Sequence, residues 1–280
     1  MSKTLYITDL DGTLLNNESR ISDTSKEILT ELSSCGKLIS VATARTPATV
    51  DPLLAGTPLN LPAIVITGAA RWDLKQKCYE YVHEMDTDLC SMVENICKLN
   101  NIIPLRYTLP RKDFLEVYRM AYGDTGMTRA ERSFIEERRK LPLKHFTFHP
   151  KADGDYGPTL LYLCFAPITD VYKAAGEMRQ QGIDSVSAYP DIFSPETGIL
   201  EVYARGVSKA AAVVELKQQT GAERLVVFGD NLNDLPMLRV ADVAVAVDNA
   251  LPEVKDAADI VIGPNMTDSV ARFIAADSSK

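Results

Sequence analysis

The sequence predicts an α/β fold with a Rossmann-like parallel-sheet core and an inserted α+β domain. Two observations lead to this prediction. Short apolar runs rich in β-branched residues recur along the chain and stop on small or acidic residues, which is typical of parallel strands covered by helices. Between residues 78 and 189 the pattern changes to mixed strands and helices, which is typical of a separate α+β module.

The strands of the predicted core alternate with helices. Between the first two strands we expect a helix that Ser22 or Asp23 caps and that Gly36 ends. A second helix begins near Ser208 and leads into the last strand, so both segments read as βαβ units. In such sheets, ligands bind at the carboxyl ends of the strands. The four expected strands are TLYITDLDG, KLISVATAR, AIVITGAA and RLVVFGDN.

The inserted segment divides the chain into two predicted domains. The core domain comprises residues 1–82 and 190–280, and the inserted α+β domain comprises residues 83–189. The stretch from residue 100 to residue 151 carries eleven Lys and Arg against six Asp and Glu. This basic stretch suits either an anionic substrate or a solvated surface, and the sequence leaves both interpretations open.

Composition and charge exclude several classes of protein. The net charge of −8 argues against a general nucleic-acid-binding surface, and no apolar run approaches the roughly 20 residues that a membrane helix needs. The first strand begins at once in KTLYIT and leaves no room for a signal peptide, so we expect a cytoplasmic protein. Five cysteines without a CxxC pair indicate reduced thiols. We expect a monomer or weak homodimer with no nucleic-acid partner and no membrane partner.

Two carboxylates close the first strand. Asp9 and Asp11 lie two residues apart, so in an extended chain both side chains point to the same side, and Gly12 then allows a sharp turn. A carboxylate can attack phosphorus, and a second carboxyl can protonate the leaving oxygen and later deprotonate water. The pair therefore supplies both halves of a two-step hydrolysis, whereas a turn or a cap explains one such Asp more readily than two.

The run VVFGDNLND places two further carboxylates, Asp230 and Asp234, at the end of another strand. Magnesium takes oxygen ligands and keeps several waters, so a few carboxylates and a phosphate oxygen suffice and no histidine is required. These two residues are therefore candidate metal ligands, and Mg²⁺ is the expected cofactor.

Two other residues suit a phosphate group. Thr43 ends the second strand, and Lys209 begins the helix that follows Ser208. Alone, such a Thr is more often a cap, and such a Lys is more often solvated. Together with Asp9 and Asp230 they form a set of nucleophile, metal ligand, hydroxyl donor and cation that can neutralise a transferring phosphoryl group.

These residues resemble the four signature motifs of the haloacid dehalogenase-like (HAD) superfamily of phosphatases. The motifs occur in the family's order, as DLDGTL, Thr43, Lys209 and GDNLND. The inserted α+β segment resembles the C2B cap of the Cof-type subfamily. The stretches ILEVYARGVSK and NALPEVKDAADIVIGPN extend the likeness to essentially the whole chain. The first and fourth motifs are the most specific.

The resemblance implies a role for each matching residue. Asp9 would be the nucleophile and a metal ligand. Asp11 would be the general acid and base, and its backbone carbonyl would also reach the metal. Asp230 would bind the metal directly, Asp234 would help to hold the metal site, and Asn233 would support it.

Phosphate binding is implied for three residues. Thr43 and Lys209 would bind the phosphoryl oxygens, and Lys209 would also steady the nucleophile. Asn249, in VDNA, matches a family asparagine near the phosphate. The chain departs from the subfamily at Ala44, where Gly is common, and at Thr67, where Asn is common, so the substrate-facing pocket is expected to differ from that of relatives.

The residues and the resemblance together predict a magnesium-dependent phosphatase. We expect it to hydrolyse a small phosphorylated metabolite, with a sugar phosphate favoured, through an aspartyl phosphate on Asp9. A phosphomutase of the phosphomannomutase type is the alternative enzyme, because phosphomannomutases resemble the same core and cap. A non-catalytic sensor of a phosphorylated ligand is the third hypothesis, although a pure binder need not retain both Asp9 and Asp11.

Overall fold

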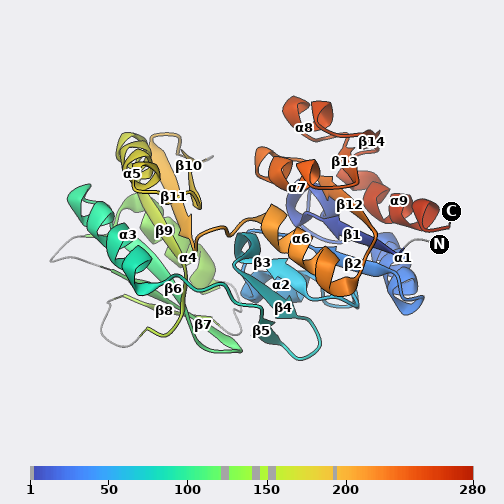
Figure 1. Cartoon of the computed structure of the whole chain (residues 1–280), viewed down its shortest axis with the longest axis horizontal. Coiled ribbons are helices and arrows are strands. Elements are labelled where there is room, and N and C mark those ends of the chain that lie inside the picture. Colours follow the sequence, from blue (N-terminus) through green and yellow to red (C-terminus); the bar gives the residue numbers. More distant parts are fainter. Residues whose placement is uncertain (1–2, 121–125, 141–145, 151–155, 192–193, 280) are drawn as a thin grey trace. The chain divides into compact units, whose positions relative to one another are not determined.

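The computed structural model describes residues 3–120, 126–140, 146–150, 156–191 and 194–279. The chain forms two compact units (Figure 1). Unit 1 comprises Met1–Glu80 and Ser208–Lys280, and unit 2 comprises Tyr81–Val207. The predicted α/β fold, with a parallel-sheet core and an inserted α+β segment, is confirmed.

Unit 1 is built on a five-stranded parallel sheet. Its strands are β1 (Thr4–Thr8), β2 (Leu38–Val41), β12 (Arg224–Gly229), β13 (Val243–Val247) and β14 (Ile260–Ile262). They lie in the order β14-β13-β12-β1-β2, and every neighbouring pair is parallel. Tyr6 and Phe228 point towards the helix at Ser269–Asp277, so the side chains that alternate with them point to the other face.

The helices of unit 1 begin and end where the sequence provides the capping residues. They are α1 (Asp23–Ser34), α2 (Pro47–Leu53), α6 (Lys209–Thr220), α7 (Leu235–Arg239), α8 (Pro252–Asp256) and α9 (Ser269–Asp277). The Ser22 side chain accepts a hydrogen bond from the backbone N–H of Ser25 at 3.0 Å, which caps α1. In the same way, the Ser208 side chain accepts from the N–H of Ala211 at 3.1 Å and caps α6. Helix α1 packs against α9, and α6 packs against α7.

The third predicted strand lies mainly in a separate sheet. β3 (Ala63–Val65) pairs antiparallel with β4 (Ala70–Asp73), which pairs antiparallel with β5 (Cys78–Glu80). A parallel bridge between Ala42 and Ile64 connects β3 with the end of β2. The chain turns back directly after β3, so this apolar run forms a short hairpin instead of a full strand of the parallel sheet.

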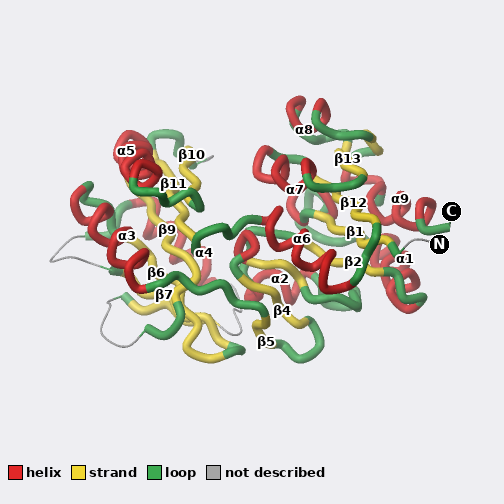
Figure 2. Tube along the Cα trace, viewed as in Figure 1, coloured by secondary structure: helices red, strands yellow, loops and turns green. Residues whose placement is uncertain are grey.

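Unit 2 mixes strands and helices, as Figure 2 shows. Its strands are β6 (Pro104–Arg111), β7 (Phe114–Arg119), β8 (Phe146–His149), β9 (Thr159–Pro167), β10 (Val186–Pro190) and β11 (Thr197–Tyr203). Its helices are α3 (Thr87–Leu99), α4 (Arg129–Lys140) and α5 (Ile168–Gln180). The sheet order is β10-β11-β9-β6-β7-β8, with β7 and β8 parallel and the other neighbours antiparallel. No helix in the described parts of either unit is long and apolar enough to cross a membrane.

The boundary between the two units differs from the predicted one. The prediction assigns residues 190–280 to the core domain, but unit 2 extends to Val207. The reason is β11, which pairs with β9 on one side and with β10 on the other. Buried and half-buried residues alternate along most of β11, as expected for a strand of an antiparallel sheet with two different faces. The first boundary, predicted after residue 82, lies after Glu80.

Three neighbouring strands of the parallel sheet lead into the candidate site. Asp9 follows β1, and Asp230 follows β12. Thr43 lies two residues beyond β2, on the other side of β1 in the sheet. Because parallel strands end at the same edge of a sheet, these side chains converge there.

Candidate active site

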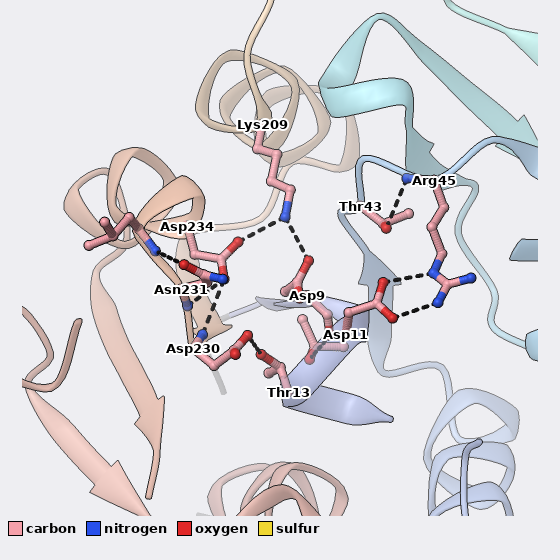
Figure 3. Close-up of polar contacts among 11 residues, drawn as sticks. Asp9, Asp11, Thr13, Thr43, Arg45, Lys209, Asp230, Asn231 and Asp234 are labelled. Carbon is pink, nitrogen blue, oxygen red and sulfur yellow. Dashed lines mark hydrogen bonds and ion pairs between the residues drawn. The ribbon is translucent and has the colours of Figure 1, made fainter. Parts of the chain in front are cut away.

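Asp9 is the first residue after β1 and lies at the centre of the site (Figure 3). Its backbone N–H donates to the carbonyl oxygen of Phe228 at 3.0 Å, and the residue is 6% exposed. The chain then turns at Gly12, whose φ is +78°. A Cβ atom at this position would collide with the carboxylate of Asp230, so both the backbone conformation and the close approach require glycine here.

Lys209 binds the Asp9 carboxylate from the start of α6. Its ammonium donates to Oδ1 of Asp9 at 2.6 Å and to Oδ1 of Asp234 at 2.8 Å (Figure 3). The side chain of Lys209 is 2% exposed, and those of Asp9 and Asp234 are 8% and 0% exposed. A lysine has three N–H donors, so one donor of Lys209 remains without a partner among the described residues.

Burial and neighbouring charges shift the pKa of these groups. Burial raises the pKa of Asp9 to about 7, although Lys209 opposes the shift. Burial also raises the pKa of Asp230 to about 6, and the hydrogen bond from Thr13 partly offsets this. For Lys209, burial acts to lower the pKa, but the carboxylates of Asp9 and Asp234 outweigh it and the pKa is raised. The ammonium of Lys209 is therefore held in its charged form. The buried carboxylates repel one another when they are ionised, so this part of the site favours the binding of a cation.

The turn from Asp230 to Asp234 is held by its own side chains. Oδ2 of Asp234 accepts from the backbone N–H groups of Asp230 and Asn231, at 3.1 and 3.2 Å. The side chain of Asn231 accepts from the N–H of Leu232 at 2.7 Å. It also accepts from the backbone N–H of Asp234, which together with the bond from the Asn231 N–H to Asp234 makes a reciprocal capping box. Both oxygens of Asp234 are thus occupied, one by Lys209 and one by the two amides.

The carboxylates of Asp9, Asp230 and Asp234 form a cluster whose ligand atoms lie within 4.8 Å of one another. Oδ1 of Asp230 accepts from the hydroxyl of Thr13 at 2.8 Å. Within the described residues, Oδ2 of Asp9 and Oδ2 of Asp230 accept no hydrogen bond. An all-oxygen set with two free carboxylate oxygens fits a hard divalent cation such as Mg²⁺. The side chain of Asp11 is not part of this cluster.

Thr43 lies on the opposite side of Asp9 from Asp230 and Asp234 (Figure 3). The residue is 1% exposed, and its hydroxyl oxygen accepts from the backbone N–H of Arg45 at 3.2 Å. The guanidinium of Arg45 binds both oxygens of Asp11, with Nε to Oδ2 at 2.7 Å and Nη2 to Oδ1 at 2.6 Å. This hydrogen-bonded contact raises the pKa of Arg45.

The two predicted asparagines take different positions. Nδ2 of Asn249 donates to the carbonyl oxygen of Gly12 at 2.7 Å, and its Oδ1 accepts from the N–H of Asn265 at 2.8 Å. Asn249 therefore braces the loop that contains Gly12, and its phosphate-binding role stays a prediction. The side chain of Asn233 is exposed and makes no hydrogen bond to a described residue, so its supporting role also stays a prediction.

Three residues that the sequence prediction leaves without a role take part in the site. They are Thr13, which binds Asp230; Arg45, which binds Asp11; and Asn231, which caps the turn from Asp230 to Asp234. A signal for Arg45 exists, since it lies two residues after Thr43 and residues two apart in an extended chain share a side. Thr13 and Asn231 offer no comparable signal, because short polar residues in turns are common.

The sequence of this chain is similar to those of known hydrolases. A family model described as haloacid dehalogenase-like hydrolase matches residues 6–274. The 5-amino-6-(5-phospho-D-ribitylamino)uracil phosphatase YcsE of Bacillus subtilis is 26% identical over 272 residues, which cover 96% of this chain and 94% of that protein. The pyridoxal phosphate phosphatase YbhA of Escherichia coli is 26% identical over 285 residues and 98% of both chains.

Solved structures have the same fold. A haloacid dehalogenase-like hydrolase from Bacteroides thetaiotaomicron has a TM-score of 0.74 at 22% identity and covers 99% of this chain and 100% of its own. A second structure, from Thermotoga maritima, has the same TM-score at 20% identity and covers 99% and 97%. The phosphatase relatives confirm the prediction of a phosphoric monoester hydrolase. Because the family model matches almost the full length of the chain, the chain belongs to the haloacid dehalogenase-like hydrolases.

Proposed function

We propose that this enzyme is a Mg²⁺-dependent phosphatase that hydrolyses a small phosphorylated metabolite through an aspartyl phosphate on Asp9. The observation that carries the proposal is the state of the Asp9 carboxylate. One of its oxygens is bound by Lys209 at 2.6 Å, and the other accepts no hydrogen bond from the described residues. A buried carboxylate that is anchored on one oxygen and open on the other suits a nucleophile.

Asp9 and Asp230 are the proposed direct ligands of Mg²⁺, because both belong to the carboxylate cluster and Asp230 retains an oxygen without a donor. Asp234 is proposed to hold the metal side of the site in place, since its two oxygens are taken up by Lys209 and by backbone amides. When bound, Mg²⁺ neutralises charge on the phosphoryl group and lowers the pKa values of its carboxylate ligands.

The proposed first step uses Asp9 and Asp11. An oxygen of Asp9 forms a bond to phosphorus while the bond from phosphorus to the leaving oxygen breaks, and Asp11 gives a proton to that oxygen. In the second step Asp11 takes a proton from water, which attacks the phosphorus and frees Asp9. Lys209 and Thr43 are proposed to bind the phosphoryl oxygens through the third N–H and the hydroxyl, respectively.

The relatives support a small phosphorylated substrate. YcsE is named for a phosphoribitylamino compound and YbhA for pyridoxal phosphate, both phosphate esters of a primary alcohol. We therefore propose a small phosphorylated metabolite as substrate, with a sugar phosphate as the preferred class. The cytoplasmic location and the monomeric or weakly dimeric state stay predictions.

Phosphate release from a panel of substrates tests the proposal. The panel contains p-nitrophenyl phosphate, sugar phosphates, nucleotides and pyridoxal phosphate, each with Mg²⁺ and with EDTA. We expect release that requires Mg²⁺, with the highest kcat/KM for a small phosphate ester. Interconversion of two sugar phosphates without release would instead indicate the phosphomutase, and binding without any turnover would indicate the sensor.

A further inference from the structure

The side chains of Arg45 and Asp11 form a two-pronged ion pair at the edge of the site (Figure 3). Nε and Nη2 of the guanidinium donate to the two different oxygens of the carboxylate, at 2.7 and 2.6 Å. A planar guanidinium matches a carboxylate in this way and fixes its plane as well as its position, which a lysine cannot do. Asp11 accepts no other side-chain hydrogen bond from the described residues.

This ion pair is poorly suited to stabilising the fold. The side chain of Asp11 is 52% exposed and that of Arg45 is 29% exposed. Ion pairs with this much access to water contribute little to stability, because solvent screens the attraction and two long side chains lose freedom. The geometry is nevertheless close to ideal, so what the pair does well is to orient the Asp11 carboxylate.

The backbone of Arg45 is itself held firmly. Its N–H donates to the hydroxyl of Thr43 at 3.2 Å, and its carbonyl oxygen accepts from the N–H of Ile66 at 3.0 Å. The N–H of Thr67 donates to the carbonyl oxygen of Thr43 at 3.0 Å. Ile66 and Thr67 make these contacts with φ of +51° and +56°, a conformation that costs free energy for β-branched residues. The strained turn thus holds the base of the Arg45 side chain.

We propose that Arg45 is a positioning residue that orients Asp11 for proton transfer to the leaving oxygen of the substrate. This inference rests on the phosphatase function proposed above. While Asp9 bonds to phosphorus and the leaving oxygen departs with its electron pair, the protonated oxygen of Asp11 gives its proton to the leaving oxygen. The other oxygen of Asp11 keeps its hydrogen bond to the guanidinium during the transfer. The resulting carboxylate regains both bonds to Arg45.

The leaving group provides a readout that separates this role from phosphate binding. An alcohol leaves only when it is protonated, whereas p-nitrophenolate is stable enough to leave without a proton. The ratio kcat/KM reports the steps up to the release of the leaving group, so it is insensitive to the later attack of water. Misplacing the acid should therefore slow alkyl phosphates selectively.

The experiment compares Arg45→Gln and Arg45→Lys with the wild type on two substrates, at saturating Mg²⁺. For the alkyl phosphate that the wild type hydrolyses best, we expect Arg45→Gln to lower kcat/KM by about 10- to 100-fold, part of the range that general acid catalysis supplies. For p-nitrophenyl phosphate, we expect a change of less than about threefold, because that step does not draw on general acid catalysis. Arg45→Lys keeps the positive charge but lacks the planar pair of N–H donors of the guanidinium. Its kcat/KM for the alkyl phosphate should therefore fall between those of Arg45→Gln and the wild type.

The control pair is Arg20→Gln and Arg20→Lys, at an exposed arginine of unit 1. Neither control variant should change kcat/KM for either substrate. Equal losses on both substrates in the Arg45 variants, or no loss on either, would overturn the positioning role. A wild type that releases no phosphate, or whose release does not depend on Asp9, would overturn the proposed function itself. The two failures are thus distinguishable.

Discussion

Lys209 and Asp9 lie 200 residues apart in the chain and are joined by a buried hydrogen bond of 2.6 Å. The same ammonium also binds Asp234 at 2.8 Å, so one cation neutralises two carboxylates that are almost inaccessible to water. A third carboxylate, that of Asp230, lies within the same cluster. When all three carboxylates are ionised, the single ammonium leaves an excess of negative charge that a divalent cation would balance.

Removing Lys209 should destabilise the metal-free protein strongly. Lys209→Met leaves Asp9 and Asp234 buried without their cation, and breaking a buried pair in this way typically costs about 3–5 kcal/mol. Lys217→Met is the matched control, because Lys217 pairs with Asp242 where both side chains are partly exposed, and it should cost less than about 1 kcal/mol. Urea unfolding in EDTA measures both. Equal midpoints for the two variants would contradict the description of the buried cluster.

Gly12→Ala should damage the metal site more than the fold. The new Cβ would collide with the Asp230 carboxylate and displace it, so we expect Mg²⁺ affinity to fall by roughly 10- to 100-fold, the scale of disturbances next to a metal site. Gly36→Ala is a close control, because Gly36 has a similar φ, +79°, with no atom in the way. In Gly36→Ala the free energy of unfolding should fall only by the cost of the left-handed conformation, about 1 kcal/mol, and the activity should be retained.

Isothermal titration calorimetry of Mg²⁺ and thermal unfolding separate these two effects. If both glycine variants bind Mg²⁺ like the wild type, the Asp230 carboxylate does not hold the metal where the proposal puts it.

The effect of Mg²⁺ on thermal stability should increase with pH. Burial raises the pKa of Asp9 to about 7 and that of Asp230 to about 6, both above the ordinary value of 3.8 for an aspartate. In this window the metal-free folded protein binds more protons than the unfolded chain, so it loses stability as the pH rises through these values. Mg²⁺ must displace those protons, so it binds more tightly at higher pH. We expect a larger rise in Tm on adding Mg²⁺ at about pH 8 than at about pH 5.5.

Asp230→Asn removes one proposed ligand and should lose most of this Mg²⁺-dependent rise at either pH. An equal rise in the wild type at both pH values would show that the metal does not bind through these carboxylates.

The proximity of the central side chains can be predicted from the sequence, because these residues follow strands of one parallel sheet or begin a capped helix. Asp9 and Asp230 come directly after neighbouring strands, and Lys209 starts a helix that Ser208 caps, so local patterns suffice to bring them together. Arg45 illustrates what local patterns miss. Arg45 and Asp11 are 34 residues apart in the chain, and their ion pair depends on the rotamers of both side chains. It also depends on the hydrogen bonds that Ile66 and Thr67 donate to the backbone of Arg45 and Thr43.

The fold shows the same division between local and long-range information. The helices α1 and α6 are predictable because Ser22 and Ser208 provide their caps. The place of β11 is not, because an alternating strand can join any sheet that offers a free edge, and only its pairing with β9 assigns it to unit 2. The run that contains β3 likewise looks like a parallel strand until the turn that follows it is known.

The most direct test of the proposed chemistry is to look for a phosphoryl group on Asp9. Wild type, Asp9→Asn and Asp11→Asn are each mixed with Mg²⁺ and p-nitrophenyl phosphate, whose leaving group departs without a proton from Asp11. The mixtures are quenched in acid and analysed by peptide mass spectrometry, alongside phosphate release. We predict that Asp9→Asn releases no phosphate, and that Asp11→Asn, lacking the base for the second step, accumulates a phosphoryl group on the peptide that contains Asp9. Phosphate release by Asp9→Asn at the wild-type rate, with no phosphorylated peptide in any variant, would contradict the proposed mechanism.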